Sequence, residues 1–232
     1  ERARKLTAYH EGGHAVVSEF LEHTDPVHYI TIIPRGPSGG ATYFRPKEDL
    51  ENFHSYSELF EEIVVSLGGR VSERLFLDDI STGASGDIQQ ATNLARAMVT
   101  QFGMSERLGP ISYDSSGHSI FIGRDFGTTK SYSEETAAEI DEEIKSIICD
   151  AYDKTKKVLS EHIDLLHRLA GVLFEREKLD ADEFLDVMNG KLLPSAQTAA
   201  AGIIPAEAAA PETTELPTEA QTEPEANTNT NE

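Results

Sequence analysis

The sequence predicts a mainly helical domain with a small β-sheet near its N-terminus. Apolar residues recur at the spacing of an amphipathic helix in several long segments. Two runs rich in β-branched and aromatic residues, 27–33 and 42–45, are typical of short strands. The chain has 232 residues, which is enough for one domain with a substantial core or for two small ones.

Six helices are expected from apolar periodicity and capping residues. They are residues 2–22, a helix from Ser55 or Ser57 to about residue 75, residues 85–102, a helix from Ser133 to about residue 159, a helix that Ser160 caps, and a short helix that starts with Asp180 and Glu183. The pair Gly68-Gly69 lies inside the second of these, where each glycine costs about 1 kcal/mol relative to alanine. We therefore expect a neighbouring helix to approach closely there.

The C-terminal residues have a different composition from the rest. From Ser195 to Glu232 there is no Lys, Arg or aromatic residue, and Pro, Thr, Ala and Glu predominate. Such a segment cannot bury enough apolar surface to offset the entropy lost on ordering. The expected organisation is a folded domain over residues 1–193 and a disordered acidic tail over residues 194–232.

Charge and cysteine content exclude several classes of protein. The net charge of -21 argues against a nucleic-acid partner, because such proteins need a basic surface. With Cys149 as the only cysteine, no disulfide and no cysteine-based zinc site can form within one chain, and we expect Cys149 in the core. No run of 18 apolar residues is present, so this fragment is expected to be soluble. The chain begins inside a predicted helix, which suggests that a neighbouring domain precedes Glu1.

The segment His10-Glu11-Gly12-Gly13-His14 has the pattern of a metal-binding helix. Histidines four residues apart project from one face of a helix and can share a zinc ion, and the glutamate after the first can act as a base towards water. The same pattern also occurs by chance as solvated polar residues. Here the flanking residues are apolar, so the polar stripe is expected to be partly buried, where it needs partners or a metal.

A catalytic zinc ion requires a third protein ligand. His23 and His28 lie beyond the helix and are expected to be exposed. The acidic candidates are Glu73, late in the Gly68-Gly69 helix, and Asp87, which follows a Gly/Ser-rich loop at the start of another helix. The residues by themselves do not separate these two.

Six blocks of sequence carry a family resemblance. They are Ala8–Val17 (AYHEGGHAVV), Thr31–Gly36 (TIIPRG), Leu67–Glu73 (LGGRVSE), Thr82–Ile88 (TGASGDI), Ala91–Val99 (ATNLARAMV), and Phe102–Ser105 followed by Leu108–Pro110 (FGMS, LGP). As an ordered set they make residues 2–190 resemble the FtsH family of ATP-dependent zinc metalloproteases.

The resemblance implies a role for each candidate residue. His10, His14 and Asp87 would bind one Zn²⁺ per chain, Glu11 would be the catalytic base, and Glu73 would lie beside the ligands. Unfolded polypeptide would add as a strand to an open edge formed by Tyr29, Ile30, Thr31, Ile32 and Ile33.

The resemblance also implies a larger assembly. The family is membrane-anchored and hexameric, and it degrades unfolded or unneeded membrane and soluble proteins. ATP would act only through an N-terminal AAA+ module, because this chain has no P-loop sequence. The full-length protein would lie in the bacterial plasma membrane, with this domain in the cytoplasm.

The chain departs from the family pattern at three places without touching a proposed ligand. Gly12 and Gly86 replace the usual Ala and Asn, and Ala41–Phe44 reads ATYF rather than the LGYT type. Two alternatives to a peptidase remain: a catalytically inactive helical hexamerisation module, and a small-molecule metal hydrolase. A free Glu11 carboxylate would distinguish the first, because a structural zinc site has four protein ligands. A closed pocket would favour the second.

Overall fold

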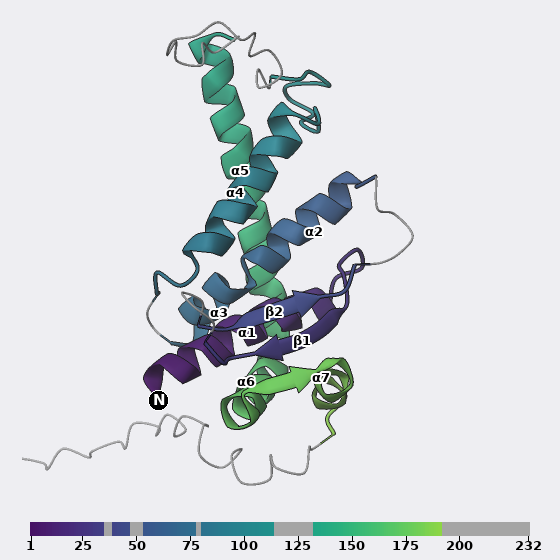
Figure 1. Cartoon of the computed structure of the whole chain (residues 1–232). Helices are drawn as coiled ribbons and strands as arrows, with labels where there is room; N and C mark the ends of the chain where they lie inside the picture. The colour runs from purple at the N-terminus through teal and green to yellow at the C-terminus, as the bar shows by residue number, and fades with distance from the viewer. Residues whose placement is uncertain (35–38, 47–52, 78–79, 114–131, 192–232) are drawn as a thin grey trace, which may run out of the picture.

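The structure is a computed structural model that describes residues 1–34, 39–46, 53–77, 80–113 and 132–191. It confirms the predicted fold class, since helices predominate around one three-stranded sheet (Figure 1). The helices are α1 (Arg2–Glu19), α2 (Tyr56–Ser66), α3 (Gly68–Phe76), α4 (Ser85–Thr100), α5 (Glu134–Glu161), α6 (Ile163–Arg176) and α7 (Ala181–Met188). The strands are β1 (Val27–Thr31), β2 (Ala41–Phe44) and β3 (Lys178–Asp180).

The sheet has the order β2-β1-β3, and both pairings are antiparallel. The expectation of an open edge at residues 29–33 is wrong, because β1 is the central strand. Tyr29, Ile30 and Thr31 pair with β2 on one side and with β3 on the other, and Ile32 N–H donates to Glu177 O at 2.8 Å. The third strand has only three residues, too few for a recognisable strand pattern. Among the described strands, β2 and β3 each have a neighbour on one side only.

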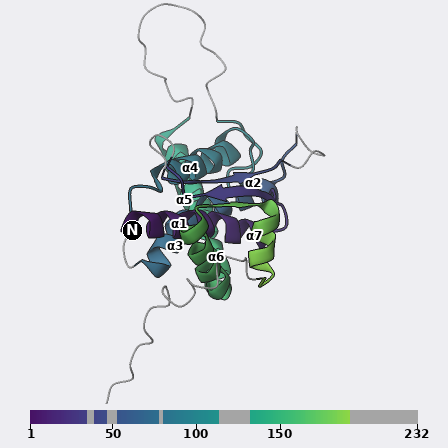
Figure 2. The same ribbon diagram turned by 60° about the horizontal axis from the view of Figure 1, so that its bottom comes forward.

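Helix α1 lies in the middle of the molecule (Figure 2). It contacts α3, α6 and the strands β1 and β2, and every residue from Ala8 to Ser18 is buried. His10, Glu11 and His14 are therefore held in the interior rather than on a solvated face. The alternative that the histidine pattern consists of solvated polar residues does not apply to this helix.

The predicted helix across Gly68-Gly69 divides into α2 and α3 at Leu67. The expected close approach of another helix is confirmed. A Cβ atom on Gly13 of α1 would lie 2.4 Å from Gly68 O, and one on Gly68 would lie 2.8 Å from Gly13 O. The backbones of α1 and α3 are thus in direct contact, and a side chain at either position would separate them.

Helix boundaries follow the capping residues in most places. Ser55 and Asp180 each begin a helix with a complete capping box, and Ser133 caps α5. Ser160 caps nothing, because α5 continues through Glu161. The described part of the chain holds no helix with the length and apolar character required to cross a bilayer.

Helices α4 and α5 contact each other and cross obliquely, and the N-terminal part of α5 extends beyond the sheet (Figure 1). Cys149 lies on α5 and is exposed, so the expectation that it is a core residue is wrong. The buried residues of this part of α5 are Ile140, Ile144, Ile147 and Ala151, and Cys149 lies off that stripe. The domain boundary at residue 193 and the tail over 194–232 lie outside the described residues and stay predictions.

Candidate metal centre

Two imidazoles on α1 face each other across one helical turn. His10 Nε2 and His14 Nε2 are 3.2 Å apart, and both residues are more than nine-tenths buried. Their spacing of four residues places them on the same face of the helix. The two histidines thus lie together in the interior, as the sequence predicts.

The opposite nitrogen of each ring is held by an oxygen atom. His10 Nδ1 lies 2.8 Å from Glu73 Oε1, and His14 Nδ1 lies 2.8 Å from the main-chain oxygen of Val65. Both partners are hydrogen-bond acceptors, so each Nδ1 carries a proton and donates it. This arrangement fixes the ring orientation and directs each Nε2 towards the centre of the site, as in histidines that bind metals.

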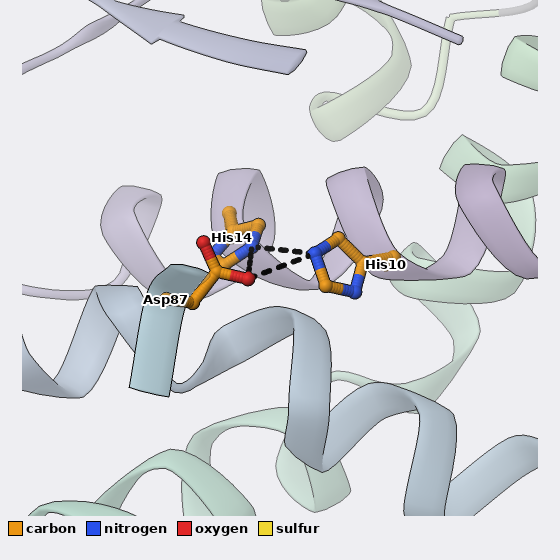
Figure 3. Close-up of side chains that lie close together, drawn as sticks. All are labelled: His10, His14 and Asp87. Atoms are coloured by element: carbon orange, nitrogen blue, oxygen red, sulfur yellow. Dashed lines mark hydrogen bonds and ion pairs between the residues drawn. The ribbon is translucent and has the colours of Figure 1, made fainter. Parts of the chain in front are cut away.

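Asp87 brings a carboxylate to the same point from the first turn of α4. Its Oδ2 atom is 3.1 Å from His10 Nε2 and 3.7 Å from His14 Nε2 (Figure 3). Among the described residues, His10, His14 and Asp87 form the one group whose ligand atoms are close enough to hold a metal ion. The sequence left Asp87 and Glu73 tied, and the structure places Asp87 with the Nε2 atoms and Glu73 on the far side of His10.

The three converging atoms fit a zinc ion. Tetrahedral zinc with bonds of about 2.0–2.2 Å places its ligand atoms roughly 3.3–3.6 Å apart. The three observed separations, 3.1, 3.2 and 3.7 Å, lie close to that range. Two nitrogens and a carboxylate oxygen are also the donor types that zinc prefers, and three protein ligands leave a fourth position for a reactant.

The electrostatics of the site favour a positive charge. Burial lowers the pKa of His10, but hydrogen bonds to Asp87 and Glu73 and the charge of Glu11 outweigh it and raise the pKa to about 9. Burial and the neighbouring His10 instead lower the pKa of His14. Burial opposes ionisation of Asp87, but the hydrogen bond with His10 lowers its pKa below the ordinary value. The surroundings that hold a proton on His10 are equally suited to a divalent cation.

Glu73 is fully buried on α3 and is held from two sides. Besides His10, its carboxylate accepts hydrogen bonds from the main-chain N–H and the hydroxyl of Ser81, at 2.9 and 3.0 Å. Burial raises the pKa of Glu73, but the hydrogen bonds from His10 and Ser81 outweigh it and lower the pKa. Glu73 is therefore an ionised carboxylate that orients His10, which agrees with its expected position beside the ligands.

Gly69 gives His10 the space that it occupies. A Cβ atom at this position would lie 2.4 Å from His10 Cε1 and 2.6 Å from each ring nitrogen. The imidazole thus packs directly on the backbone of α3. Sequence reasoning did not assign this role, although the glycine pair inside a helix was the signal for it.

Glu11 lies beside the histidines and lines the same cleft. Its carboxylate is buried, and Oε2 accepts a hydrogen bond of 2.8 Å from Thr42 Oγ1 on β2. The cleft has a volume of about 1340 Å³ and is open to solvent along β2 and the start of α2. His23 and His28 are exposed, as expected, and neither joins the metal cluster.

The sequence of the chain matches a known family of proteins. Residues 1–187 match the sequence profile of peptidase family M41. Over 199 residues the chain is 55% identical to the ATP-dependent zinc metalloprotease FtsH 1 of Thermoanaerobacter sp. (strain X514), an alignment that covers 86% of this chain and 32% of that protein. The ATP-dependent zinc metalloprotease FtsH of Caldicellulosiruptor bescii is 52% identical over 184 residues, which are 79% of this chain and 30% of that protein.

A third relative, ATP-dependent zinc metalloprotease FtsH 2 of Methylacidiphilum infernorum (isolate V4), is 48% identical over 193 residues, 83% of this chain and 30% of that protein. The chain belongs to peptidase family M41. It spans about a third of the length of the relatives that it matches.

Proposed function

We propose that this chain is the zinc-dependent endopeptidase domain of a membrane-anchored, ATP-dependent protease that degrades unfolded or unneeded membrane and soluble proteins. The observation that carries the proposal is the convergence of His10 Nε2, His14 Nε2 and Asp87 Oδ2 beside the buried carboxylate of Glu11. The zinc metalloprotease names of the relatives support the choice of metal and of reaction.

In this proposal His10, His14 and Asp87 hold one Zn²⁺ per chain. When bound, Zn²⁺ polarises the peptide carbonyl and makes a water molecule acidic enough to ionise near neutral pH. Glu11 accepts the proton of the attacking water and passes it to the nitrogen of the leaving amine. Glu73 keeps the His10 imidazole in position, and its negative charge makes that ring a stronger ligand.

Unfolded polypeptide is the proposed substrate, bound as an added strand. The strand that can accept it is β2 rather than the predicted residues 29–33, because β2 is the edge strand of the described sheet that borders the cleft. Ala41, Thr42 and Phe44 of β2 line the cleft that also contains His10 and Glu11. Main-chain pairing at this edge would give little dependence on substrate sequence, and the open cleft is less suited to a small-molecule substrate.

The proposed assembly is a homo-hexamer in which an AAA+ ATPase module and a transmembrane region precede this domain in the full-length protein. The relatives have about three times the length of the matched segment, and their names include ATP dependence. The full-length protein would lie in the bacterial plasma membrane, with this domain on the cytoplasmic side. No nucleic acid is proposed as a partner.

The test compares the purified chain with Asp87→Ala and Glu11→Gln, and uses exposed Asp141→Ala on α5 as the control. We expect about one zinc per chain and casein hydrolysis in the original and control proteins. Asp87→Ala should lose zinc and activity together. Glu11→Gln should keep zinc but lose activity by about 100-fold or more, because general-base catalysis is removed.

The second candidate is a catalytically inactive hexamerisation module with structural zinc. It predicts that neither the original chain nor any variant hydrolyses casein, whatever the zinc content. Full activity in Glu11→Gln would instead contradict the proposed mechanism, because that mechanism requires the Glu11 carboxylate as the base.

A further inference from the structure

A hydroxyl group on the edge strand contacts the proposed catalytic base. Thr42 Oγ1 lies 2.8 Å from Glu11 Oε2 and 3.0 Å from the main-chain oxygen of Glu11. Thr42 belongs to the ATYF segment that departs from the family pattern. A glutamate side chain has three rotatable bonds, whereas a threonine is stiff at χ1 and here stands on a hydrogen-bonded strand. The hydroxyl can therefore hold the carboxylate in one orientation.

The backbone of Thr42 points away from the rest of the sheet. In antiparallel pairs, alternate residues direct both their N–H and C=O groups to the same neighbouring strand. Ile32 N–H donates to Glu177 O next to β3, so Ile30 also faces β3, while Tyr29 and Thr31 face β2. Their partners on β2 are Tyr43 and Ala41, respectively, which therefore face β1.

It follows that Thr42, which lies between these two residues, directs its N–H and C=O groups to the outer edge of β2. Its side chain lies on the inner face of the sheet, since it is opposite the fully buried Ile30 and reaches Glu11 on α1. Tyr29 and Tyr43 stack on the other face, with ring centroids 4.3 Å apart. One residue thus presents its main chain to the cleft edge and its side chain to the base.

We propose that Thr42 is the positioning residue for Glu11, and that it links the binding of a substrate strand on β2 to the orientation of the base. The inference rests on the proposed peptidase function and on β2 as the substrate-binding edge. A strand that pairs with the main chain of Thr42 is set at a fixed distance from the Glu11 carboxylate. The scissile bond and the base are then aligned by the same residue.

The test uses Thr42→Val, which removes the hydroxyl but keeps the branched shape, and Thr42→Ser, which keeps the hydroxyl. Thr42→Ala is a second variant without the hydroxyl. Thr100→Val on α4 is the matched control, because it removes a buried hydroxyl that donates to a main-chain oxygen far along another helix. For each zinc-loaded chain, kcat and KM are measured with an unstructured fluorogenic peptide, together with zinc content and thermal stability.

Thr42→Val and Thr42→Ala should lower kcat about tenfold, equivalent to about 1.4 kcal/mol, and change KM by less than about twofold. Thr42→Ser should restore most of kcat, and zinc content and melting temperature should stay unchanged. Adding Thr42→Val to Glu11→Gln should cause no further loss of the residual rate, because the hydroxyl acts through Glu11. Adding Thr42→Val should also leave the peptide Kd of Glu11→Gln, measured by fluorescence anisotropy, unchanged.

The inference is overturned if the original chain is active and Thr42→Val has the same kcat. It is also overturned if Thr42→Val lowers the rate by the same factor in the original chain and in Glu11→Gln. It is also overturned if Thr42→Val and Thr42→Ala lose zinc or melt earlier than the Thr100→Val control, since that indicates a structural role. An original chain that binds no zinc and cleaves no peptide instead contradicts the proposed function itself.

Discussion

The two glycines between the metal-binding histidines should respond in opposite directions to a single added methyl group. In Gly13→Ala the new Cβ atom would lie 2.4 Å from Gly68 O and 2.8 Å from the Cβ atom of Ser72. The first contact is about 1 Å shorter than a favourable separation, and the atom that must yield is main chain. In Gly12→Ala the nearest atom is Leu166 Cδ1 at 3.1 Å, the end of a flexible side chain.

Both substitutions gain about 1 kcal/mol of helix propensity. For Gly13→Ala this gain is opposed by an overpacking cost of roughly 3 kcal/mol, the upper part of the usual range, because α1 and α3 must separate. The net loss of about 2 kcal/mol should lower the melting temperature by roughly 4–8 °C in a chain of this size. Gly12→Ala should leave it unchanged or raise it by up to about 4 °C.

The assay is thermal unfolding of the original chain and the two variants, followed by far-UV circular dichroism at equal zinc concentration. Zinc content measured in the same samples separates loss of the metal from loss of packing. Equal melting temperatures for Gly12→Ala and Gly13→Ala, or a stabilised Gly13→Ala, would refute the claim that direct contact between α1 and α3 requires glycine.

Three further predictions concern groups around the site and the core. Gly69→Ala should weaken zinc binding at least about tenfold with little change in helix content, because its Cβ atom would displace the His10 ring; elemental analysis after dialysis measures this. Glu73→Gln should weaken zinc binding by about 10–100-fold, since a neutral amide holds His10 less firmly, and competition with a chelating dye gives the affinity. Burial opposes ionisation of Glu61, but hydrogen bonds from Lys154 and a main-chain N–H outweigh it and lower the pKa of Glu61. The ionised Glu61 therefore stabilises the fold above about pH 4.3, and this stabilisation is lost as the pH falls through the folded-state pKa. The difference in free energy of unfolding between the original chain and Glu61→Gln, from urea titrations, should therefore shrink as the pH is lowered from about 6 to 3.

Sequence periodicity and capping chemistry predicted most of the fold because they act locally. The capping boxes at Ser55 and Asp180 and the apolar stripes of the long helices are set by residues a few positions apart. The sheet was harder, since strand pairing joins distant segments. The third strand, Lys178–Asp180, is too short to give a pattern, and without it the sequence predicts that β1 has an open edge.

The candidate site divides in the same way. The spacing of His10 and His14 is a property of one helix and could be predicted from five residues. The choice between Glu73 and Asp87 depends on how α3 and α4 pack against α1, which the residues alone left open and the family resemblance decided. Gly69, Ser81 and Thr42 went unassigned, because their roles arise only from contacts between elements far apart in the sequence.

These contacts make metal binding and packing depend on the same helix crossing. Gly13 and Gly68 bring α1 and α3 into backbone contact, and the next residue, Gly69, supports the His10 ring. One turn further along α3, Glu73 holds the outer nitrogen of that ring. A change that separates α1 from α3 must therefore move Glu73 away from His10, so we expect loss of zinc to accompany loss of stability in Gly13→Ala. Gly69→Ala acts on the ring alone and should separate the two effects.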